Sequence, residues 1–161
     1  MDRKVKAYTI FEILVALIII GILMAVVIRP ILIFVAKQRL NQATNIVVAT
    51  LNETKAYSIM KDNLMGIQAD QNTGIIHQFI DKNNNCQYDS GENYRDINLP
   101  TNIIFINDIF FLFDRRGYPV NASCGLGPGP VVLKNNYDMY KTICVDRYGR
   151  IRVLEGNVSC N

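Results

Sequence analysis

The chain of 161 residues has room for one modest domain plus a membrane anchor. Half of its residues are hydrophobic, but a run before residue 30 inflates this fraction, so the remainder has an ordinary soluble composition. Residues 1–7 supply +2 of the formal net charge of +3, and the remaining charge of about +1 is no electrostatic footprint of a nucleic-acid-binding domain. Composition alone names no charged partner.

An unbroken apolar run from Ile13 to Ile28 follows a short basic segment at the N-terminus. Counted from Tyr8, the stretch is long enough to cross a bilayer as a helix, which needs about 20 residues. The run is too long for a secretory signal peptide, and no A-x-A-like cleavage site follows it. The sequence therefore predicts a transmembrane helix over residues 8–29.

Glu12 directly precedes this apolar run. Transfer of a carboxylate into lipid costs several kcal/mol unless the carboxylate finds a partner. A plain membrane anchor has no use for such a residue. The segment KAYTIFEILVALIIIGIL resembles the N-terminal signature of type IV pilins and type II secretion pseudopilins. The resemblance implies that a prepilin peptidase cuts between Ala7 and Tyr8, which stand where Gly and Phe are usual, and removes residues 1–7.

The resemblance also implies a role for Glu12. Cleavage exposes the α-amino group of Tyr8, which is positively charged near neutral pH. In a filament of staggered parallel helices, Glu12 of one subunit would meet this amine on its neighbour, and the two charges would neutralise each other. We therefore expect Glu12 to set the register between subunits. Before assembly, the apolar run would hold the subunit in the bacterial inner membrane, with the basic leader on the cytoplasmic side.

Residues 30–62 predict an amphipathic continuation of the same helix. Pro30 would kink this helix rather than end it. Apolar or small residues recur three and four positions apart, which is typical of one helix face packed on a domain. These residues are Ala36, Leu40, Ala43, Val47, Leu51 and Thr54.

After Asp62 the pattern changes to short β-type runs separated by turn residues. A Gly/Pro loop spans Ala122–Pro130, and Tyr148–Gly149 marks a tight turn. The predicted strands are Leu64–Gln68, Ile75–Ile80, Ile103–Ile106, Ile109–Asp114, Val131–Lys134, Thr142–Asp146 and Arg150–Leu154. We therefore predict an α+β fold, in which the long helix packs on a C-terminal antiparallel β-sheet domain over residues 63–161, as in the pilin fold.

Two segments of this domain resemble one particular group of pilin-like proteins. FDRRGYPVN at Phe113–Asn121 and ICVDRYGRIRV at Ile143–Val153, with PVVLKN between them, are similar to the C-terminal half of the GspH/FimT group. This group comprises minor pseudopilins of type II secretion and minor pilins of type IV pili. The resemblance implies a structural subunit at or near the tip of a filament, with a periplasmic or extracellular domain and other pilin or pseudopilin subunits as partners.

Four cysteines lie beyond the predicted anchor: Cys86, Cys124, Cys144 and Cys160. None forms a CxxC pair, so a zinc site is a poor interpretation. In an exported domain an even number suggests up to two disulfides, and the sequence leaves three connectivities open. We favour Cys144–Cys160, which would tie the C-terminal tail to the last hairpin. Buried free thiols are the alternative.

The loop from Asp81 to Glu92 has the ligand spacing of an EF-hand calcium loop, with oxygen side chains at positions 1, 3, 5, 9 and 12. The residues in question are Asp81, Asn83, Asn85, Gln87 (through its backbone carbonyl), Asp89 and Glu92. Cys86 stands at position 6, where Gly normally permits the sharp turn. A structural Ca²⁺ site is therefore one hypothesis, and a solvated turn is the other. We expect that the function of the protein requires no cofactor.

A GRIR motif at residues 149–152 is a second candidate site. On a strand, Arg150 and Arg152 would share one face while Ile151 and Val153 face the core. The motif resembles the GRxR by which some FimT-like minor pilins bind DNA during natural transformation. Three more arginines would add phosphate contacts if they converged there: Arg115, Arg116 and Arg147. The near-neutral charge of the mature chain and the lack of stacking aromatics beyond Tyr148 favour the alternative, a solvated strand edge.

The sequence carries no catalytic motif. Its only histidine, His77, lies in a predicted strand with no Ser or Cys motif around it, and there is neither a phosphate-binding glycine loop nor an HExxH. We therefore expect no enzymatic activity. A membrane-anchored periplasmic binding module remains an alternative. Cleavage after Ala7 would separate the two interpretations, because a mere anchor keeps its leader.

Overall fold

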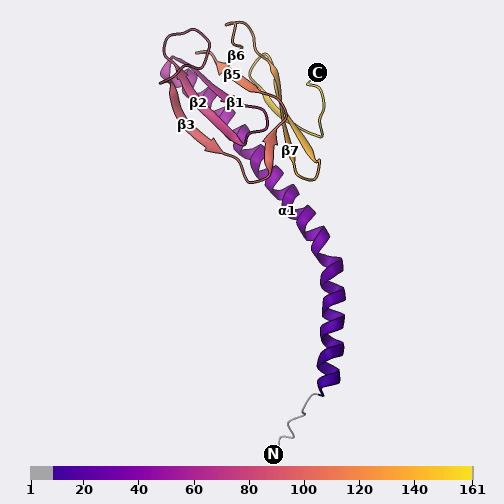
Figure 1. Cartoon of the computed structure of the whole chain (residues 1–161). Coiled ribbons are helices and arrows are strands. Elements are labelled where there is room, and N and C mark those ends of the chain that lie inside the picture. Colours follow the sequence, from indigo (N-terminus) through magenta and orange to yellow (C-terminus); the bar gives the residue numbers. More distant parts are fainter. Residues whose placement is uncertain (1–8, 161) are drawn as a thin grey trace, which may run out of the picture. The chain divides into compact units, whose positions relative to one another are not determined.

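The computed structural model describes residues 9–160, and the chain forms two compact units, Met1–Val35 and Ala36–Asn161. One helix, α1 (Ile10–Lys61), supplies most of the described residues of the first unit and continues into the second (Figure 1). Pro30 lies inside α1 and does not end it, as predicted. Tyr8, the first residue of the predicted helix, lies outside the described residues.

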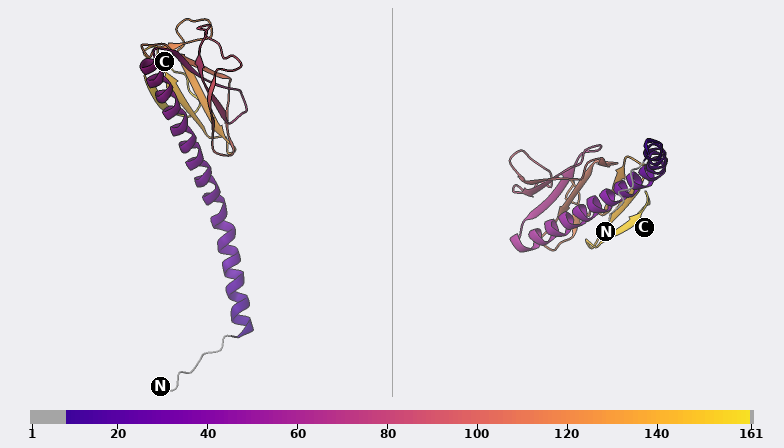
Figure 2. Two further views of the ribbon diagram at one scale, coloured as in Figure 1. Left: turned by 90° about the vertical axis from the view of Figure 1, so that its left-hand side faces the viewer. Right: turned by 90° about the horizontal axis from the view of Figure 1, so that it is seen from below.

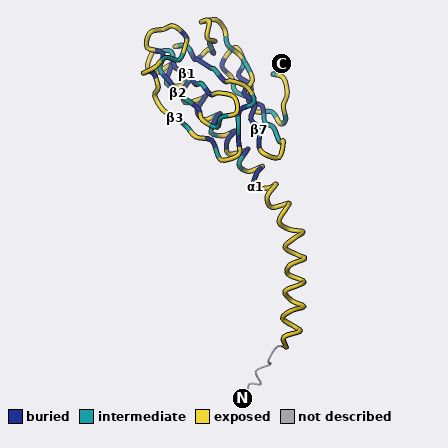
Figure 3. The backbone as a smooth tube through the Cα atoms, in the orientation of Figure 1, coloured by how far each residue is buried: buried dark blue, intermediate teal, exposed yellow. Residues whose placement is uncertain are grey.

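In the first unit, every described residue from Thr9 to Val35 is exposed (Figure 3). This part of α1 is long and apolar enough to cross a membrane, by length and composition. A helix that is apolar all round is stable only where something other than water covers it, such as lipid or neighbouring helices.

In the second unit, α1 is amphipathic, as predicted. The predicted stripe is buried at all six positions: Ala36, Leu40, Ala43, Val47, Leu51 and Thr54. Lys37, Gln38 and Asn45, on the other side of the helix, are exposed. Spacings of three and four keep side chains on one face of a helix with 3.6 residues per turn, so this face is the one that the β-strands cover.

Nine strands follow α1 in the described part of the chain, and they form two antiparallel sheets. The first sheet has the strand order β3-β2-β1-β5-β6 and the second has the order β4-β7-β8-β9. The strands of the first sheet are β1 (Leu64–Ala69), β2 (Ile75–Asp81), β3 (Asn93–Asn98), β5 (Ile109–Phe113) and β6 (Pro119–Val120). Those of the second are β4 (Ile103–Phe105), β7 (Gly129–Asn135), β8 (Tyr140–Val145) and β9 (Ile151–Glu155). The predicted α+β class is confirmed, and a long N-terminal helix with antiparallel sheets is consistent with the pilin fold.

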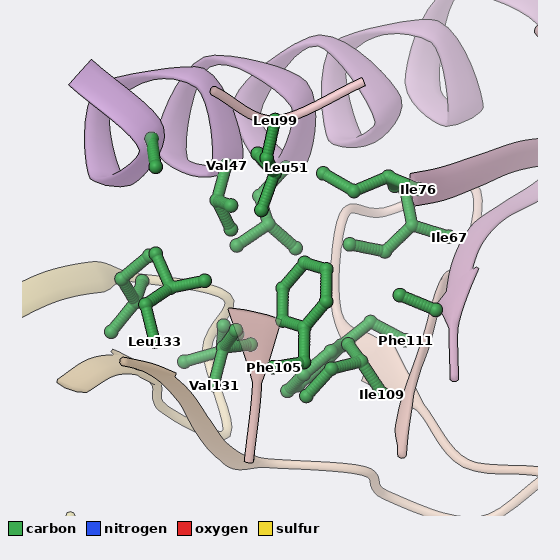
Figure 4. Close-up of a cluster of buried hydrophobic side chains, with 14 of the residues drawn as sticks. Val47, Leu51, Ile67, Ile76, Leu99, Phe105, Ile109, Phe111, Val131 and Leu133 are labelled. Atoms are coloured by element: carbon green, nitrogen blue, oxygen red, sulfur yellow. The ribbon is translucent and has the colours of Figure 1, made fainter. Parts of the chain in front are cut away.

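The core lies where α1 and both sheets meet. In both views of Figure 2, the part of α1 that belongs to the second unit lies alongside the strands. Figure 4 shows Phe105 of β4 surrounded by Val47 and Leu51 of α1 and by apolar side chains of both sheets. Each large apolar side chain fully buried there contributes about 1.5–3 kcal/mol, so this single cluster joins the three layers into one domain.

The seven predicted strands correspond to β1, β2, β4, β5, β7, β8 and β9, with ends that differ by at most two residues. The prediction missed β3 and β6. β3 is an edge strand of sequence NYRDIN in which only Ile97 is even partly buried, so its side chains give no alternation of apolar and polar residues. β6 is two residues long and pairs only with β5.

Both disulfides lie in the second unit. Cys144 of β8 is bonded to Cys160 in the tail after β9, as predicted, and Cys86 is bonded to Cys124 in the Gly/Pro loop. The alternative of free thiols is wrong, because all four cysteines lie in the described part of the chain and are paired. Such pairs form in oxidising compartments, which agrees with an exported domain.

Candidate functional site

The first turn of α1 is closed by two reciprocal hydrogen bonds. The backbone N–H of Thr9 donates to Oε2 of Glu12 over 3.4 Å, and the backbone N–H of Glu12 donates to Oγ1 of Thr9 over 3.3 Å. This arrangement is a capping box, in which a Thr before the helix and a Glu three residues later satisfy each other's backbone donors. The prediction gave Glu12 a role between subunits only and missed its role within the chain, although the T-x-x-E spacing carries the signal.

The carboxylate of Glu12 is also well placed electrostatically. A negative charge in the first turn of a helix interacts favourably with the partial positive charge of the helix N-terminus. The predicted cleavage site, Ala7 and Tyr8, lies outside the described residues. The pairing of Glu12 with a neighbour's Tyr8 amine therefore stays a prediction.

The loop between β2 and β3 is built around two buried carboxylates. Asp81 accepts the backbone N–H of Asn85 at Oδ1 over 3.2 Å and that of Cys86 at Oδ2 over 2.8 Å. Cys86, at the position where a calcium loop has Gly, adopts the left-handed conformation with φ of 58°. The backbone therefore makes the sharp turn without a glycine, and the disulfide to Cys124 fixes the residue that bears the strain.

The other end of this loop is closed in the same way. Glu92 accepts the backbone N–H of Lys82 at Oε1 over 2.9 Å and that of Asp89 at Oε2 over 3.1 Å. The side-chain amides of Asn83 and Asn85 both donate to Oδ2 of Asp89 over 2.8 and 2.6 Å, and these bonds, led by that of Asn83, lower the pKa of Asp89.

No group of three or more acidic, His or Cys side chains within residues 9–160 is arranged to hold a metal ion. In this structure N–H donors satisfy the loop carboxylates. Of the predicted calcium ligands, the structure brings Asn83, Asn85 and Asp89 together, whereas Asp81 and Glu92 are occupied by the backbone. Gln87 donates its backbone N–H to Oδ1 of Asn85 over 2.9 Å. Calcium binding by the loop stays a prediction.

Two turns of the domain have the same construction. Asp114–Gly117, of sequence DRRG, joins β5 to β6, and Asp146–Gly149, of sequence DRYG, joins β8 to β9. In each turn, Oδ1 of the aspartate accepts the backbone N–H groups two and four residues later over 2.8–2.9 Å. The N–H of Arg150 is the main cause of a lowered pKa for Asp146.

The two turns touch each other. Gly117 and Gly149 both have the left-handed backbone conformation, with φ of 81° and 70°. A Cβ atom on Gly149 would lie only 2.4 Å from the carbonyl oxygen of Gly117. Lys55 of α1 packs its side-chain carbons against both glycines and donates from Nζ to the carbonyl oxygen of Gly149 over 2.9 Å. The ends of both sheets and one helix therefore meet at this point.

This contact places Arg115, Arg116 and Arg147 in adjoining turns. DNA binding by these arginines stays a prediction. Nη1 of Arg115 is 3.4 Å from Oδ2 of Asp62. Nε of Arg150 is 3.4 Å from Oδ2 of Asp146 in its own turn. The side chains of both pairs are largely exposed apart from that of Asp146, so neither ion pair holds its arginine strongly.

The prediction for the GRIR motif is partly wrong. β9 begins at Ile151, so Arg150 lies in the turn and only Arg152 is on the strand. Ile151 packs partly against the core, as predicted, but Val153 is 43% exposed. The reason is that β9 is the last strand of the second sheet and alternates only weakly between a covered and an open side.

One further polar pair on the first sheet is formed by His77 of β2 and Asp96 of β3. Nδ1 of His77 is 2.7 Å from Oδ1 of Asp96, and this hydrogen bond is the main cause of a lowered pKa for Asp96. The ring of His77 also stacks on Tyr88. The contact joins two strands at the sheet surface, and the expectation of no enzymatic activity stays a prediction.

Comparison with family models matches residues 2–28 to the prokaryotic N-terminal methylation motif. No curated protein and no solved structure matches the chain. The matched segment includes Ala7, Tyr8 and Glu12 and runs along the exposed apolar part of α1. The chain thus carries a type IV prepilin motif at its N-terminus, and this motif supports a type IV pilin-like protein.

Proposed function

We propose that the chain is a minor pilin or pseudopilin, a structural subunit of a type IV pilus or of a type II secretion pseudopilus. A prepilin peptidase cuts it between Ala7 and Tyr8, and the mature subunit joins a filament through α1. The observation that carries this proposal is the methylation motif at residues 2–28, which includes the first turns of a helix whose residues are all exposed up to Val35.

The physical argument concerns what covers that helix. Large apolar side chains surround it, and water is a poor solvent for such a surface. Before assembly, lipid of the inner membrane covers the helix. After assembly, the equivalent helices of neighbouring subunits take the place of lipid, and the Glu12 carboxylate faces the freed amine of Tyr8. The disulfide-bonded domain remains on the oxidising side of the membrane.

The mass of the subunit purified from its native source tests this proposal. A chain that begins at Tyr8 and carries one added methyl group is the expected result. A chain that still begins at Met1 would overturn the proposal and favour the alternative of a membrane-anchored periplasmic binding module. Its presence in sheared filaments, or its co-purification with other pilin subunits, is the second expected result.

A second candidate is a DNA-binding minor pilin that serves natural transformation. One observation favours it: the contact between Gly117 and Gly149 brings the arginines of two turns to the same end of the domain. Tyr148, between Arg147 and the contact, is 63% exposed and offers a ring on which a base can stack. The net charge of the chain is small, so such binding would rest on this local cluster and would weaken steeply with salt.

A further inference from the structure

Three tripeptides of the second unit have the Asn-x-Ser/Thr pattern of an N-glycosylation acceptor: Asn52-Glu-Thr54, Asn121-Ala-Ser123 and Asn157-Val-Ser159. The pattern alone does not distinguish them. The fold does, because it engages the side-chain amides of Asn52 and Asn121 in hydrogen bonds and leaves that of Asn157 open. Asn52 lies on α1, where its Nδ2 donates to the carbonyl oxygen of Val48 over 2.9 Å, and Thr54 of the same tripeptide is buried.

The amide of Asn121 holds the Gly/Pro loop together. Its Oδ1 accepts the backbone N–H groups of Ser123 and Gly125, each over 3.0 Å, and its Nδ2 donates to the carbonyl oxygen of Leu126 over 3.3 Å. The nitrogen that would bear a sugar is therefore already engaged. Modification of Asn121 would break the bonds that fold the loop around the Cys86–Cys124 disulfide.

Asn157 lies in the tail between the end of β9 and Cys160, and it is exposed. Within residues 9–160 its side-chain amide has no hydrogen-bond partner, and Ser159, two residues later, is exposed with a hydroxyl that is equally unengaged. Both groups that the acceptor pattern requires are therefore open to an enzyme.

The backbone around Asn157 is held from both sides. Oγ1 of Thr142 donates to the carbonyl oxygen of Gly156 over 2.7 Å and accepts the N–H of Val158 over 3.2 Å. Cys160 is bonded to Cys144. The chain thus presents the asparagine at a fixed place on the surface, at little cost in conformational entropy when an enzyme binds it.

A carboxylate stands two residues before the asparagine. Oε1 of Glu155 is 2.9 Å from Nζ of Lys141, but the glutamate side chain is 78% exposed. The Lys141 side chain is only 13% exposed, so the carboxylate stays beside it, and the open side of the carboxylate is available to a cationic subsite of a transferase.

We propose that Asn157 is an N-glycosylation site. The donor is an oligosaccharide linked to a lipid pyrophosphate, and the enzyme is an oligosaccharyltransferase. A bond forms between Nδ2 of Asn157 and the anomeric carbon, and the bond from that carbon to the pyrophosphate oxygen breaks. The lipid pyrophosphate leaves with the bonding electron pair, and a base of the enzyme takes one amide proton. The inference rests on the export of the domain, which the proposed function entails.

The test is the intact mass of the full chain, produced in a bacterial host that supplies an oligosaccharyltransferase, its lipid-linked oligosaccharide and a co-expressed acceptor protein. The mature chain is expected to gain the mass of one oligosaccharide. Asn157→Gln and Ser159→Ala are expected to lose it completely, and Glu155→Gln is expected to lower the modified fraction. Ser123→Ala is the matched control and keeps the glycan, because Asn121 is bonded to the backbone N–H of residue 123 and not to its hydroxyl.

The same mass spectrum distinguishes failure of the glycosylation inference from failure of the proposed function. A chain that has lost its leader and oxidised its four cysteines, but carries no glycan while the co-expressed acceptor is modified, overturns this inference and leaves the proposed function intact. A glycan that persists in Ser159→Ala also overturns the inference. A chain that keeps its leader and its reduced thiols contradicts the proposed function instead.

Discussion

Thr9 and Glu12 hold each other at the first turn of α1, each accepting the other's backbone N–H on a side-chain oxygen. The carboxylate that the proposed filament uses between subunits is therefore also part of the helix that carries it. The two roles differ in what they need. The cap needs a hydrogen-bond acceptor, which an amide also provides, whereas pairing with a neighbour's amine needs the negative charge.

Glu12→Gln separates these roles. The glutamine keeps the capping box and loses the charge, whereas Glu12→Ala loses both and costs about 1 kcal/mol of helix stability in addition. We expect both variants to insert into the membrane and to enter filaments poorly. The measurement is the ratio of each variant in sheared filaments to that in the membrane fraction. Normal incorporation of Glu12→Gln would show that Glu12 serves only as a cap.

Gly149→Ala tests the contact between the two turns. The new Cβ would lie 2.4 Å from the carbonyl oxygen of Gly117, at a position with φ of 70°. We expect a loss of more than about 2 kcal/mol, the upper end of the left-handed backbone cost, seen as a lower Tm of the chain in detergent. Gly91→Ala is the matched control, because its φ is 97° but no atom lies within 4 Å of the new Cβ. Equal losses in the two variants would contradict the close contact.

The DNA-binding candidate predicts a specific effect of Arg147→Ala and Arg150→Ala. Each is expected to weaken binding of double-stranded DNA at all sequences and to lower the slope of log K against log salt by about 0.9 for each phosphate that is no longer neutralised. Lys37→Ala removes the same charge about 27 Å away from Lys55 along α1 and serves as the control. Fluorescence anisotropy at several salt concentrations measures both quantities. Equal affinity and slope in the arginine variants and in the control exclude the adjoining turns as a DNA site.

Acid is expected to destabilise the domain through three aspartates whose pKa values are lowered in the fold. The causes are the hydrogen bonds from Asn83 to Asp89, from His77 to Asp96 and from the N–H of Arg150 to Asp146. A lowered pKa gives stability that is present above the unfolded pKa of about 3.9 and is lost as pH falls through the folded value. Tm should therefore fall as pH is lowered from about 5 to about 3.

Asp146→Asn isolates one part of this effect. Its Oδ1 still accepts the turn N–H groups, but the side chain no longer titrates. The fall of Tm with acid should therefore be shallower in this variant than in the natural chain. An unchanged slope would mean that the turn aspartate does not contribute to the pH dependence.

The sequence predicted those parts of the fold that local patterns determine. The buried stripe from Ala36 to Thr54 was correct at every position, because a helical period over five turns is a strong signal. β3 was missed, because an exposed edge strand has no apolar alternation. The T-x-x-E spacing of Thr9 and Glu12 is the signature of the cap, although these residues also belong to the motif of a membrane-spanning helix.

The contact between the two turns could not be predicted from the sequence, for a different reason. DRRG and DRYG are visible as similar strings, yet which hairpins meet depends on how two sheets pack across α1. Such a contact between distant segments of the chain produces no local sequence pattern. The same holds for the difference between Asn121 and Asn157, since only the folded loop shows which amide is engaged.

The meeting of Gly117 with Gly149 has a consequence for how the domain responds to force. Peptide groups in direct contact have no side chain between them to yield, and Lys55 fastens the pair to α1. A force applied along the helix axis is therefore transmitted to the β5–β6 and β8–β9 hairpins at the same time. The two sheets of the second unit would then resist the force together, and neither sheet would detach from the helix before the other.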